Sequence, residues 1–526
     1  MYTGRKEIYT DVREITSENL IEVLQKAMIT FSTNVTETNY LINYEKGVQP
    51  LTRTKKYRAD INCECIDNIA NEITDFKLGF QWANPTTLVQ RSENKELSDA
   101  ITELNEQYDL AGISKNTQKL GYDVETCGVG YVLIDINTEY EDGENYFTHN
   151  VLSPTCTFVV KSSLYVDHRN MLGVTFRTDE YGNRYFTCYT KNNRYDVINL
   201  QTIVNADGTE EKPTESKWKH ASESGDKNPL GMIPIIEYVR SHDKMGCFER
   251  QLSEMNNLNL LISDFTNDVE QNTQAIWHTN DVDFPTEQVV NEDGTVTEVQ
   301  HKAKTNDWLQ TYTTPEGKTP FVKPLSIEYD YRGMLENILT RRALILQKCN
   351  VPQRNDNSGG STGIAMSDAT GWSAAETSAT KQQSIIDGCK MEEVKVVLRA
   401  IKKHPDISAD CPLLKLKYSD IKPNTNRQKN YELTTKVNFF ATAVSHGING
   451  LHALKAMNAF EDVNQVWEDS RELIKKYQSS IFDKTENTDV QNEAVGGMDE
   501  QKPNSDRLEQ DKSDQEINSP VMTGQK

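Results

Sequence analysis

The stretch that decides the fold runs from Phe248 to Trp277 and reads FERQLSEMNNLNLLISDFTNDVEQNTQAIW. Its apolar residues recur at alternating steps of three and four residues: Met255, Leu258, Ile262, Phe265, Val269 and Ile276, with Asn272 in the remaining position. A 3.5-residue repeat forms an apolar seam that packs lengthwise against a near-parallel helix. The pattern predicts one helix over 248–277, which would span roughly 43 Å at 1.5 Å per residue.

Two acidic residues of this stretch lie outside the seam. Asp264 and Asp268 are four residues apart and share another face of the predicted helix. Like charges at that spacing slightly destabilise an isolated helix. Either another interaction or function keeps them there, or both are simply well solvated.

A second helix is predicted over Tyr331–Cys349, with Arg341 and Arg342 interrupting its apolar pattern. Residues 278–330, between the two helices, are rich in strand-forming residues, prolines and turn signals such as Asp293-Gly294. The sequence therefore predicts a hairpin of two helices with a small β module at its tip.

Residues 1–247 read as a mixed α+β unit in which helices come first and antiparallel hairpins follow. An N-cap at Thr16 begins the first helix, and residues 201–230 are predicted to form a surface loop. The other predicted helices are 62–78, 97–108 and 113–127, and the predicted strands are 129–137, 146–151, 172–178, 184–190 and 231–239.

The part after the second helix begins with a predicted flexible loop that contains Ser358-Gly-Gly-Ser-Thr-Gly363. A long helix over 373–403 follows and ends before Pro405, and a short strand is predicted over 414–418. Residues 426–477 read as helical, with a break at Ser445-His-Gly-Ile-Asn-Gly450. From Asp483 onward the chain has 11 acidic residues, 5 basic residues and no aromatic residue, a composition that predicts disorder.

The overall composition restricts the class of protein. The formal net charge is −22, whereas proteins that grip a phosphate backbone are usually basic. This charge argues against a conventional DNA-binding protein but not against a conduit through which DNA slides. The sequence contains no apolar stretch long enough to span a bilayer, no signal peptide is expected at its beginning, and its nine cysteines form no CxxC pair. We therefore expect a protein made in a cytoplasm, with no membrane partner and with free thiols.

The motifs of common enzymes do not occur. Gly317-Lys318-Thr319 is a near match to a phosphate-binding loop, but Tyr312 stands where that loop needs its first glycine. Asp281 and Asp283 could form a carboxylate pair, which leaves a DNA-processing enzyme as a minor alternative. The sequence predicts no enzyme, no cofactor, no metal site and no catalytic residue.

Several ordered segments resemble the portal proteins of tailed bacteriophages, of the type found in long-tailed phages (siphophages) of Gram-positive hosts. Tyr40, Tyr44, Gly47 and Arg53 are similar to an early pattern of that family. The closest match is Asn228-Pro-Leu-Gly-Met-Ile-Pro-Ile-Ile-Glu237 followed by the long helix rich in Asn and Asp. Ser361-Thr-Gly-Ile-Ala-Met366 is similar to the family's element before its central helix. The shared order covers about residues 16–480.

The resemblance implies an α+β portal fold with wing, stem, clip and crown regions, and a homo-oligomeric ring of twelve subunits. The regions carried over are wing 1–247, stem helices 248–277 and 331–350, clip 278–330, tunnel loop 351–368, central helix and wing return 369–424, crown 425–482 and tail 483–526. The residues that would form the tunnel loop are Asn355, Asn357, Ser358, Gly359, Gly360 and Ser361.

The resemblance also implies a structural role at one vertex of the virion capsid, with assembly in the host cytoplasm. Double-stranded DNA would pass through the ring during packaging and ejection. The large terminase subunit and the head–tail adaptor would dock mainly on residues 278–330, and the major capsid and scaffolding proteins would be further partners. Another phage head–tail connector or baseplate protein is the alternative.

Under this interpretation two pairs of charged residues gain hypothetical roles. Asp264 and Asp268 are candidates for the lining of the DNA channel, or else they face the capsid or solvent. Arg341 and Arg342 would contact phosphates or pair with acidic residues of a neighbouring subunit.

Overall fold

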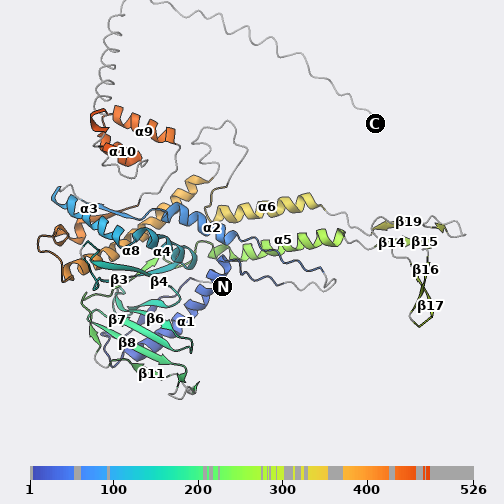
Figure 1. The fold of residues 1–526 in the computed structure, drawn as a ribbon, viewed down its shortest axis with the longest axis horizontal. Coiled ribbons are helices and arrows are strands. Elements are labelled where there is room, and N and C mark those ends of the chain that lie inside the picture. Colours follow the sequence, from blue (N-terminus) through green and yellow to red (C-terminus); the bar gives the residue numbers. More distant parts are fainter. Residues whose placement is uncertain are drawn as a thin grey trace, which may run out of the picture. The chain divides into compact units, whose positions relative to one another are not determined.

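The protein divides into two compact units, Met1–Gln428 and Lys429–Lys526 (Figure 1). The computed structural model describes residues 4–52, 61–91, 95–141, 143–204, 210–211, 217–222, 225–273, 277–280, 282–283, 286–291, 293–300, 312–313, 321–324, 330–353, 371–425, 433–457, 466–467 and 470–473. The content of helices and strands confirms the α+β class.

A seven-stranded sheet forms one part of the first unit (Figure 1). Its strands, in spatial order, are β1 (Ile8–Thr10), β5 (Thr157–Ser162), β6 (Asn170–Thr178), β7 (Arg184–Tyr189), β8 (Asn193–Leu200) and β11 (Lys217–His220), with β12 (Asp226–Lys227) also on β8. Helix α1 (Leu20–Glu45) covers one face, where Phe31 packs against Phe158 with 4.4 Å between the ring centroids. The predicted β6–β7 hairpin is confirmed, whereas the parallel edge strand β1 was not predicted.

A three-stranded sheet in the order β13–β3–β4 forms the second layer. Its strands are β3 (Val129–Ile136), β4 (Phe147–Leu152) and β13 (Ile235–Val239). Helices α3 (Lys95–Leu110), α4 (Ile113–Cys127) and α8 (Trp372–Lys403) share a buried core with it. Gly128 ends α4 with φ +79°, and a side chain there would collide with the backbone carbonyl of Lys244. These helices and strands confirm the predictions for 97–108, 113–127, 129–137, 146–151 and 373–403.

Some predictions of secondary structure are wrong. Residues 61–68 are extended, and α2 spans only Ile69–Lys77, followed by one turn of π-helix at Leu78–Trp82. The strand predicted over 414–418 is replaced by two short 3₁₀ helices, Pro412–Lys415 and Tyr418–Asp420. Leu413 and Leu416 are both fully buried, and a spacing of three places them on one side of a 3₁₀ turn.

Short strands complete this unit. The prediction of a surface loop over 201–230 is wrong in part. This segment contains β9 (Ile203–Val204) and β10 (Glu210–Glu211), which pair with each other, and also β11 and β12, which pair with β8 of the seven-stranded sheet. After the second 3₁₀ helix, β20 (Ile421–Asn424) pairs with β2 (Thr87–Gln90).

The predicted helical hairpin consists of α5 (Leu252–Thr273) and α6 (Tyr331–Lys348), which lie side by side (Figure 1). The prediction of one helix over 248–277 is wrong at its ends, because a 3₁₀ turn at Glu249–Gln251 precedes α5 and Trp277 already begins a strand. The segment between them folds into three antiparallel strand pairs. These are β14 (Trp277–Asn280) with β19 (Phe321–Pro324), β15 (Val282–Asp283) with β18 (Tyr312–Thr313), and β16 (Thr286–Val290) with β17 (Val296–Gln300). Along the chain, β14 follows α5 and β19 precedes α6, so the three strand pairs lie between the two helices of the hairpin in the sequence.

The second unit contains α9 (Leu433–Ser445) and α10 (Gly450–Met457), which pack on each other through Ala443, Val444 and Ala453. The predicted break at 445–450 is confirmed, with Gly447 at φ +84°. The segment 483–526 lies outside the described residues. None of the described helices is long and apolar enough to cross a membrane.

Candidate functional site

The helix α5 presents three different faces. Its seam residues Met255 and Leu258 are buried in a core shared with α1, α2 and α6, and Ile262 and Phe265 pack against the edge of that core. Further along the seam, Val269 is 40% exposed, and Ile276 lies outside the described residues. The inner half of the predicted seam therefore holds the hairpin to the body of the protein.

A second face of α5 carries a ladder of polar side chains that bind the extended segment 61–68. Asn267 accepts a hydrogen bond from the backbone N–H of Cys63 at 2.7 Å and donates one to its carbonyl at 3.0 Å. Ser263 Oγ accepts from the N–H of Cys65 at 3.0 Å. Asn259 Oδ1 accepts from the N–H of Asp67 at 3.0 Å. The side chains of a helix thus replace the neighbouring strand that an extended backbone normally pairs with.

Spacing explains why this ladder forms. Four residues advance a helix by about 6.0 Å, and two residues advance an extended strand by about 6.7 Å. Every fourth residue of α5 therefore meets every second residue of 61–68. The sequence does contain this signal, since the polar residues of α5 recur at steps of four, but their partner lies about two hundred residues earlier and local patterns could not identify it.

Replacing Asn259 with alanine is expected to destabilise the unit by about 1–3 kcal/mol, because it leaves buried partners unpaired. Asn259 is 1% exposed, and its Nδ2 also donates to Gln49 Oε1 at 2.6 Å. Asn257→Ala, at an exposed position of the same helix, is the control and should change stability by less than about 0.5 kcal/mol. The thermal unfolding midpoints of the variants measure the difference. Equal midpoints for the two variants would show that the ladder is not stabilising.

The predicted channel residues Asp264 and Asp268 lie on the third face of α5. At about 100° per residue, this face is about 80–120° around the helix from Leu258, on the side away from the ladder. Both side chains are half-buried. The structure therefore places the two carboxylates on one side of α5, separate from its seam and its ladder. Their role as channel lining stays a prediction.

The two arginines of α6 both contact acidic residues of the same chain. Arg342 Nε donates to Asp67 Oδ2 at 2.9 Å, and its guanidinium also contacts Glu72. Arg341 lies 3.8 Å from the carboxylate of Glu254 on α5. Arg342 therefore ties α6 to the segment held by the ladder. Contacts with phosphates or with a neighbouring subunit stay predictions.

The predicted tunnel-loop residues Asn355, Asn357, Ser358, Gly359, Gly360 and Ser361 lie outside the described residues. The backbone on both sides of the segment is described. Asn350, at the end of α6, has φ +54°, and Gly371, before α8, has φ +87°. Both are in the left-handed region, which turns the chain sharply at each end.

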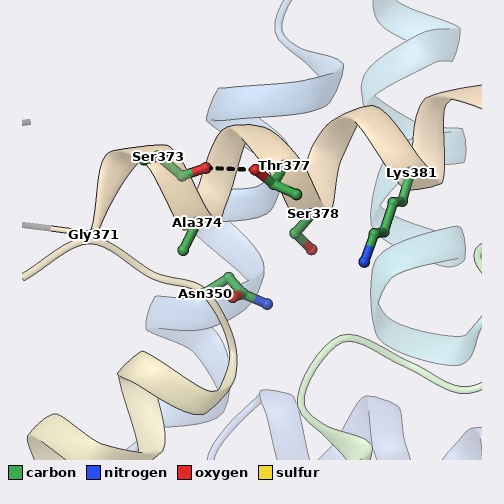
Figure 2. A pocket seen from close by; sticks show the side chains of 7 residues that line it. All are labelled: Asn350, Gly371, Ser373, Ala374, Thr377, Ser378 and Lys381. Carbon is green, nitrogen blue, oxygen red and sulfur yellow. Dashed lines mark hydrogen bonds between the residues drawn. The ribbon is translucent and has the colours of Figure 1, made fainter. Parts of the chain in front are cut away.

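These two ends lie close together. Figure 2 shows Asn350 beside the first turns of α8, where Gly371, Ser373, Ala374, Thr377, Ser378 and Lys381 line a pocket with it. Thr377 Oγ1 donates to the backbone carbonyl of Ser373 at 2.9 Å. The buried Lys77 Nζ donates to the carbonyl of Asn350 at 3.2 Å, which attaches the end of α6 to α2. The residues that flank segment 354–370 therefore lie close together, and the end of α6 is attached to α2.

Glu125 is a buried carboxylate that joins α4 to three other parts of the first unit. Its side chain is fully buried and accepts hydrogen bonds from Arg240 Nε at 2.8 Å, from Trp82 Nε1 at 3.1 Å and from the side-chain amide of Gln382 on α8. Burial raises the pKa of Glu125, but the charge and hydrogen bond of Arg240 outweigh burial and hold the pKa below its usual range. Glu125 is therefore ionised in the folded protein.

A second buried carboxylate, Glu393, anchors the other half of α8. It accepts hydrogen bonds from Lys390 Nζ at 2.6 Å and from the Tyr238 hydroxyl at 2.5 Å, and His149 Nε2 lies 3.5 Å away. Burial raises the pKa of Glu393, whereas Lys390 and His149 lower it, and the net result is a pKa well below the usual range. The long helix is therefore attached to β4 by the contact with His149 and to β13 by the hydrogen bond of Tyr238, as well as by apolar packing.

Asp123 of α4 differs from these two carboxylates because its Oδ2 has no hydrogen-bond partner among the described residues. Burial raises its pKa from 3.8 to about 7, against a small opposite effect of Lys119. The folded state therefore holds a proton that the unfolded state releases above about pH 4. The corresponding stability is present below pH 4 and is lost as the pH rises through 7.

Replacing Asp123 with asparagine is expected to raise the thermal midpoint at pH 8 relative to the parent and to raise it less at pH 5, because the loss of stability develops between about pH 4 and pH 7. The midpoint rises because asparagine carries no charge, which removes the penalty of ionising the buried Asp123 carboxyl at the higher pH, on the order of 2–4 kcal/mol. Asp99→Asn, at an exposed position of α3, serves as the control. Midpoints recorded from pH 5 to pH 8 test this, and a difference between Asp123→Asn and parent that stays constant over that range would contradict it.

Metal and disulfide chemistry find no support in the part of the chain that the structure describes. The described residues contain no group of three His, Cys, Asp or Glu side chains that could hold a metal ion. All nine cysteines are free thiols in the structure. Asp283 belongs to the short strand β15, and Asp281 lies outside the described residues, so the carboxylate pair suggested by the sequence is not tested.

The comparisons with known proteins place the chain among the structural proteins of phage particles. A family model described as "Phage portal protein, SPP1 Gp6-like" matches residues 53–480. The chain therefore belongs to the SPP1 Gp6-like family of phage portal proteins, a structural and non-enzymatic family of virion capsid components. A search of curated proteins gave no match. The family match confirms the resemblance to phage portal proteins and favours a portal over another connector or a baseplate protein, whereas the type of host stays a prediction.

Proposed function

We propose that this chain is the subunit of a ring at one capsid vertex, and that the ring is the channel for double-stranded DNA during packaging and ejection. Family membership supports the portal role. The observation that carries the proposal is the α5–α6 hairpin, because its inner half is anchored in the body of the protein while α6 keeps an exposed apolar side.

That apolar side is a stripe along the outer part of α6, formed by Tyr331, Leu335 and Leu339. These residues follow one another at steps of four and are 36%, 47% and 56% exposed. Residues four apart lie on one side of a helix. An exposed apolar stripe is typical of a surface that another protein covers. In a ring of identical subunits, the neighbouring copy covers it, and the same contact repeats until the ring closes.

The charge of the protein suits a channel that does not hold DNA. Each chain carries a formal net charge of −22, so a ring of twelve is strongly acidic. Basic proteins bind DNA because their cations neutralise the phosphates and release the counterions of the DNA. Acidic walls instead repel the phosphates, so the channel does not hold the DNA. Asp264 and Asp268, on the side of α5 away from the ladder, are the residues proposed to line the channel.

The regions follow the family pattern in this proposal. The body formed by 1–247 and 369–424 is the wing, and α5 and α6 are the stem. The β module within 278–330 is the clip, which would dock the large terminase subunit and later the head–tail adaptor. The helices at 425–482 are the crown, and 351–368 is the tunnel loop. The major capsid and scaffolding proteins would contact the assembled ring.

Native mass spectrometry of the full chain, together with negative-stain images of the same sample, tests the proposal. We expect rings of about twelve subunits with an open centre wide enough for duplex DNA. A chain that stays at 59.9 kDa at every concentration, with no ring in the images, would contradict it.

A further inference from the structure

A basic pocket lies on the C-terminal half of α8, in a protein that is otherwise acidic. Lys395, Arg399, Lys402 and Lys403 all line it, and its volume is about 450 Å³. These positions fall within about 100° of the helix circumference, so the four cations share one side of α8. We call this surface, with Met232, Leu398 and Tyr418, the α8 cationic pocket.

Among the described residues, carboxylates compensate only a small part of this charge. Lys395 pairs with Glu392 at 2.5 Å. Arg399 donates instead to the backbone carbonyl of Gly231 at 3.3 Å, and Lys402 donates to the carbonyl of Leu416 at 2.7 Å. These neutral acceptors orient the cations without cancelling their charge.

The dipole of α8 accounts for only part of the cluster. Cations are favoured in the last turn of a helix, where Lys402 and Lys403 lie. Lys395 and Arg399 lie one to two turns earlier, where the effect of the helix terminus has faded. The exposed Lys403 makes no ion pair with any described residue, and Lys415 and Lys417 add further exposed positive charge close to Tyr418 in the chain.

The pocket also has an apolar part, which distinguishes between possible ligands. Met232 and Leu398 line it, and Tyr418 at its edge is 38% exposed. Lys395 Nζ lies 4.7 Å from the centroid of the Tyr418 ring, which holds the ring beside the cations. A phosphate backbone needs cations alone. An acidic peptide that carries an apolar side chain uses both parts, the carboxylates at the rim and the apolar side chain inside.

We propose that the α8 cationic pocket binds an acidic peptide segment of a partner protein, with one apolar side chain of that segment inserted beside Tyr418. Charge complementarity selects the occupant, because a surface with several uncompensated cations on an acidic protein attracts a segment rich in Asp and Glu. The inference does not depend on the channel, since every residue of the pocket lies in the body of the protein and outside the α5–α6 hairpin.

Fluorescence anisotropy with the full chain tests the proposal. The probe is a labelled synthetic peptide of alternating Glu and Leu with one central Phe. Two competitors are used, poly-glutamate of equal charge and a DNA duplex. We expect saturable binding of the probe, displacement by poly-glutamate only at several-fold higher concentration, and affinity that falls as salt is added. Absence of binding at millimolar probe overturns the proposal, and so does preferential binding of the duplex at the same pocket.

Two double variants with the same change in net charge separate the pocket from general electrostatics. Arg399→Glu/Lys403→Glu alters the pocket and should weaken probe binding at least about tenfold. Lys217→Glu/Lys219→Glu alters two exposed lysines of β11 and should leave the affinity within about twofold. Equal losses in both variants overturn the proposal. If the pocket variant instead changes the mass of the assembled protein, the occupant is a second copy of this chain and the proposal also fails. Unfolding midpoints equal to that of the parent establish that both variants are folded.

Discussion

Replacing Glu125 with alanine is expected to destabilise the Met1–Gln428 unit by about 3–5 kcal/mol, more than any other single substitution that we propose. The loss leaves the guanidinium of Arg240 without its carboxylate, and it removes acceptors from Trp82 and Gln382 at once. A buried cation without its partner is costly because the protein cannot replace the water that it lost.

The fluorescence of the protein offers a direct measurement, because Trp82 donates to Glu125 and should report the change locally. Glu22→Ala is the matched control. Glu22 and Lys26 form an ion pair of nearly the same length, 2.7 Å against 2.8 Å for Glu125 and Arg240, but both of its side chains are exposed. We expect the control to unfold at the temperature of the parent, since solvent screens exposed pairs. If both variants unfold together, burial of the pair is not what stabilises the unit.

Introducing Leu335→Glu together with Leu339→Glu is expected to stop ring assembly and leave only single chains. Both side chains are exposed in the isolated subunit, so glutamate there costs the fold little, whereas a neighbouring subunit would have to bury two charges at the contact. The penalty repeats at every subunit interface of the ring. Native mass spectrometry measures the assembly, and circular dichroism confirms that the helices persist.

Ile29→Glu/Val166→Glu is the control for this experiment. Ile29 and Val166 are 72% and 97% exposed, belong to α1 and to a loop of the body, and receive the same added charge. The control should assemble like the parent. Rings of unchanged size in the Leu335→Glu/Leu339→Glu variant would show that the stripe is not a contact between subunits.

Much of the fold was predictable where local patterns and local structure agree. The helix over 113–127 ends at a glycine, and Gly128 does cap it in the left-handed conformation. The seam of α5 could be predicted because a heptad repeat indicates one buried side of a helix, whatever that side packs against. The β module was readable from its turns. The family resemblance, which the family model confirms, rested on the order of such segments along the chain.

Other features depended on residues far apart in the sequence. Cys63 and Cys65 fall within the helix predicted over 62–78, yet their backbone is extended because Asn267 and Ser263 supply its hydrogen bonds. The pairing of Arg342 with Asp67 follows from the same contact, since the ladder brings that segment to α6. No local signal marked Glu125 as buried either, because its partners come from three distant segments.

The sequence by itself therefore determined which segments are helices with an apolar side, where glycine and proline end them, and that an acidic chain carries a helical hairpin around a β module. Only the tertiary structure decided which polar residues are buried and which partners they hold. The physical reason is that apolar periodicity acts over one or two turns of a single element, whereas a buried polar group is stable only when a second segment, in this protein often more than a hundred residues away, supplies its hydrogen bond or opposite charge.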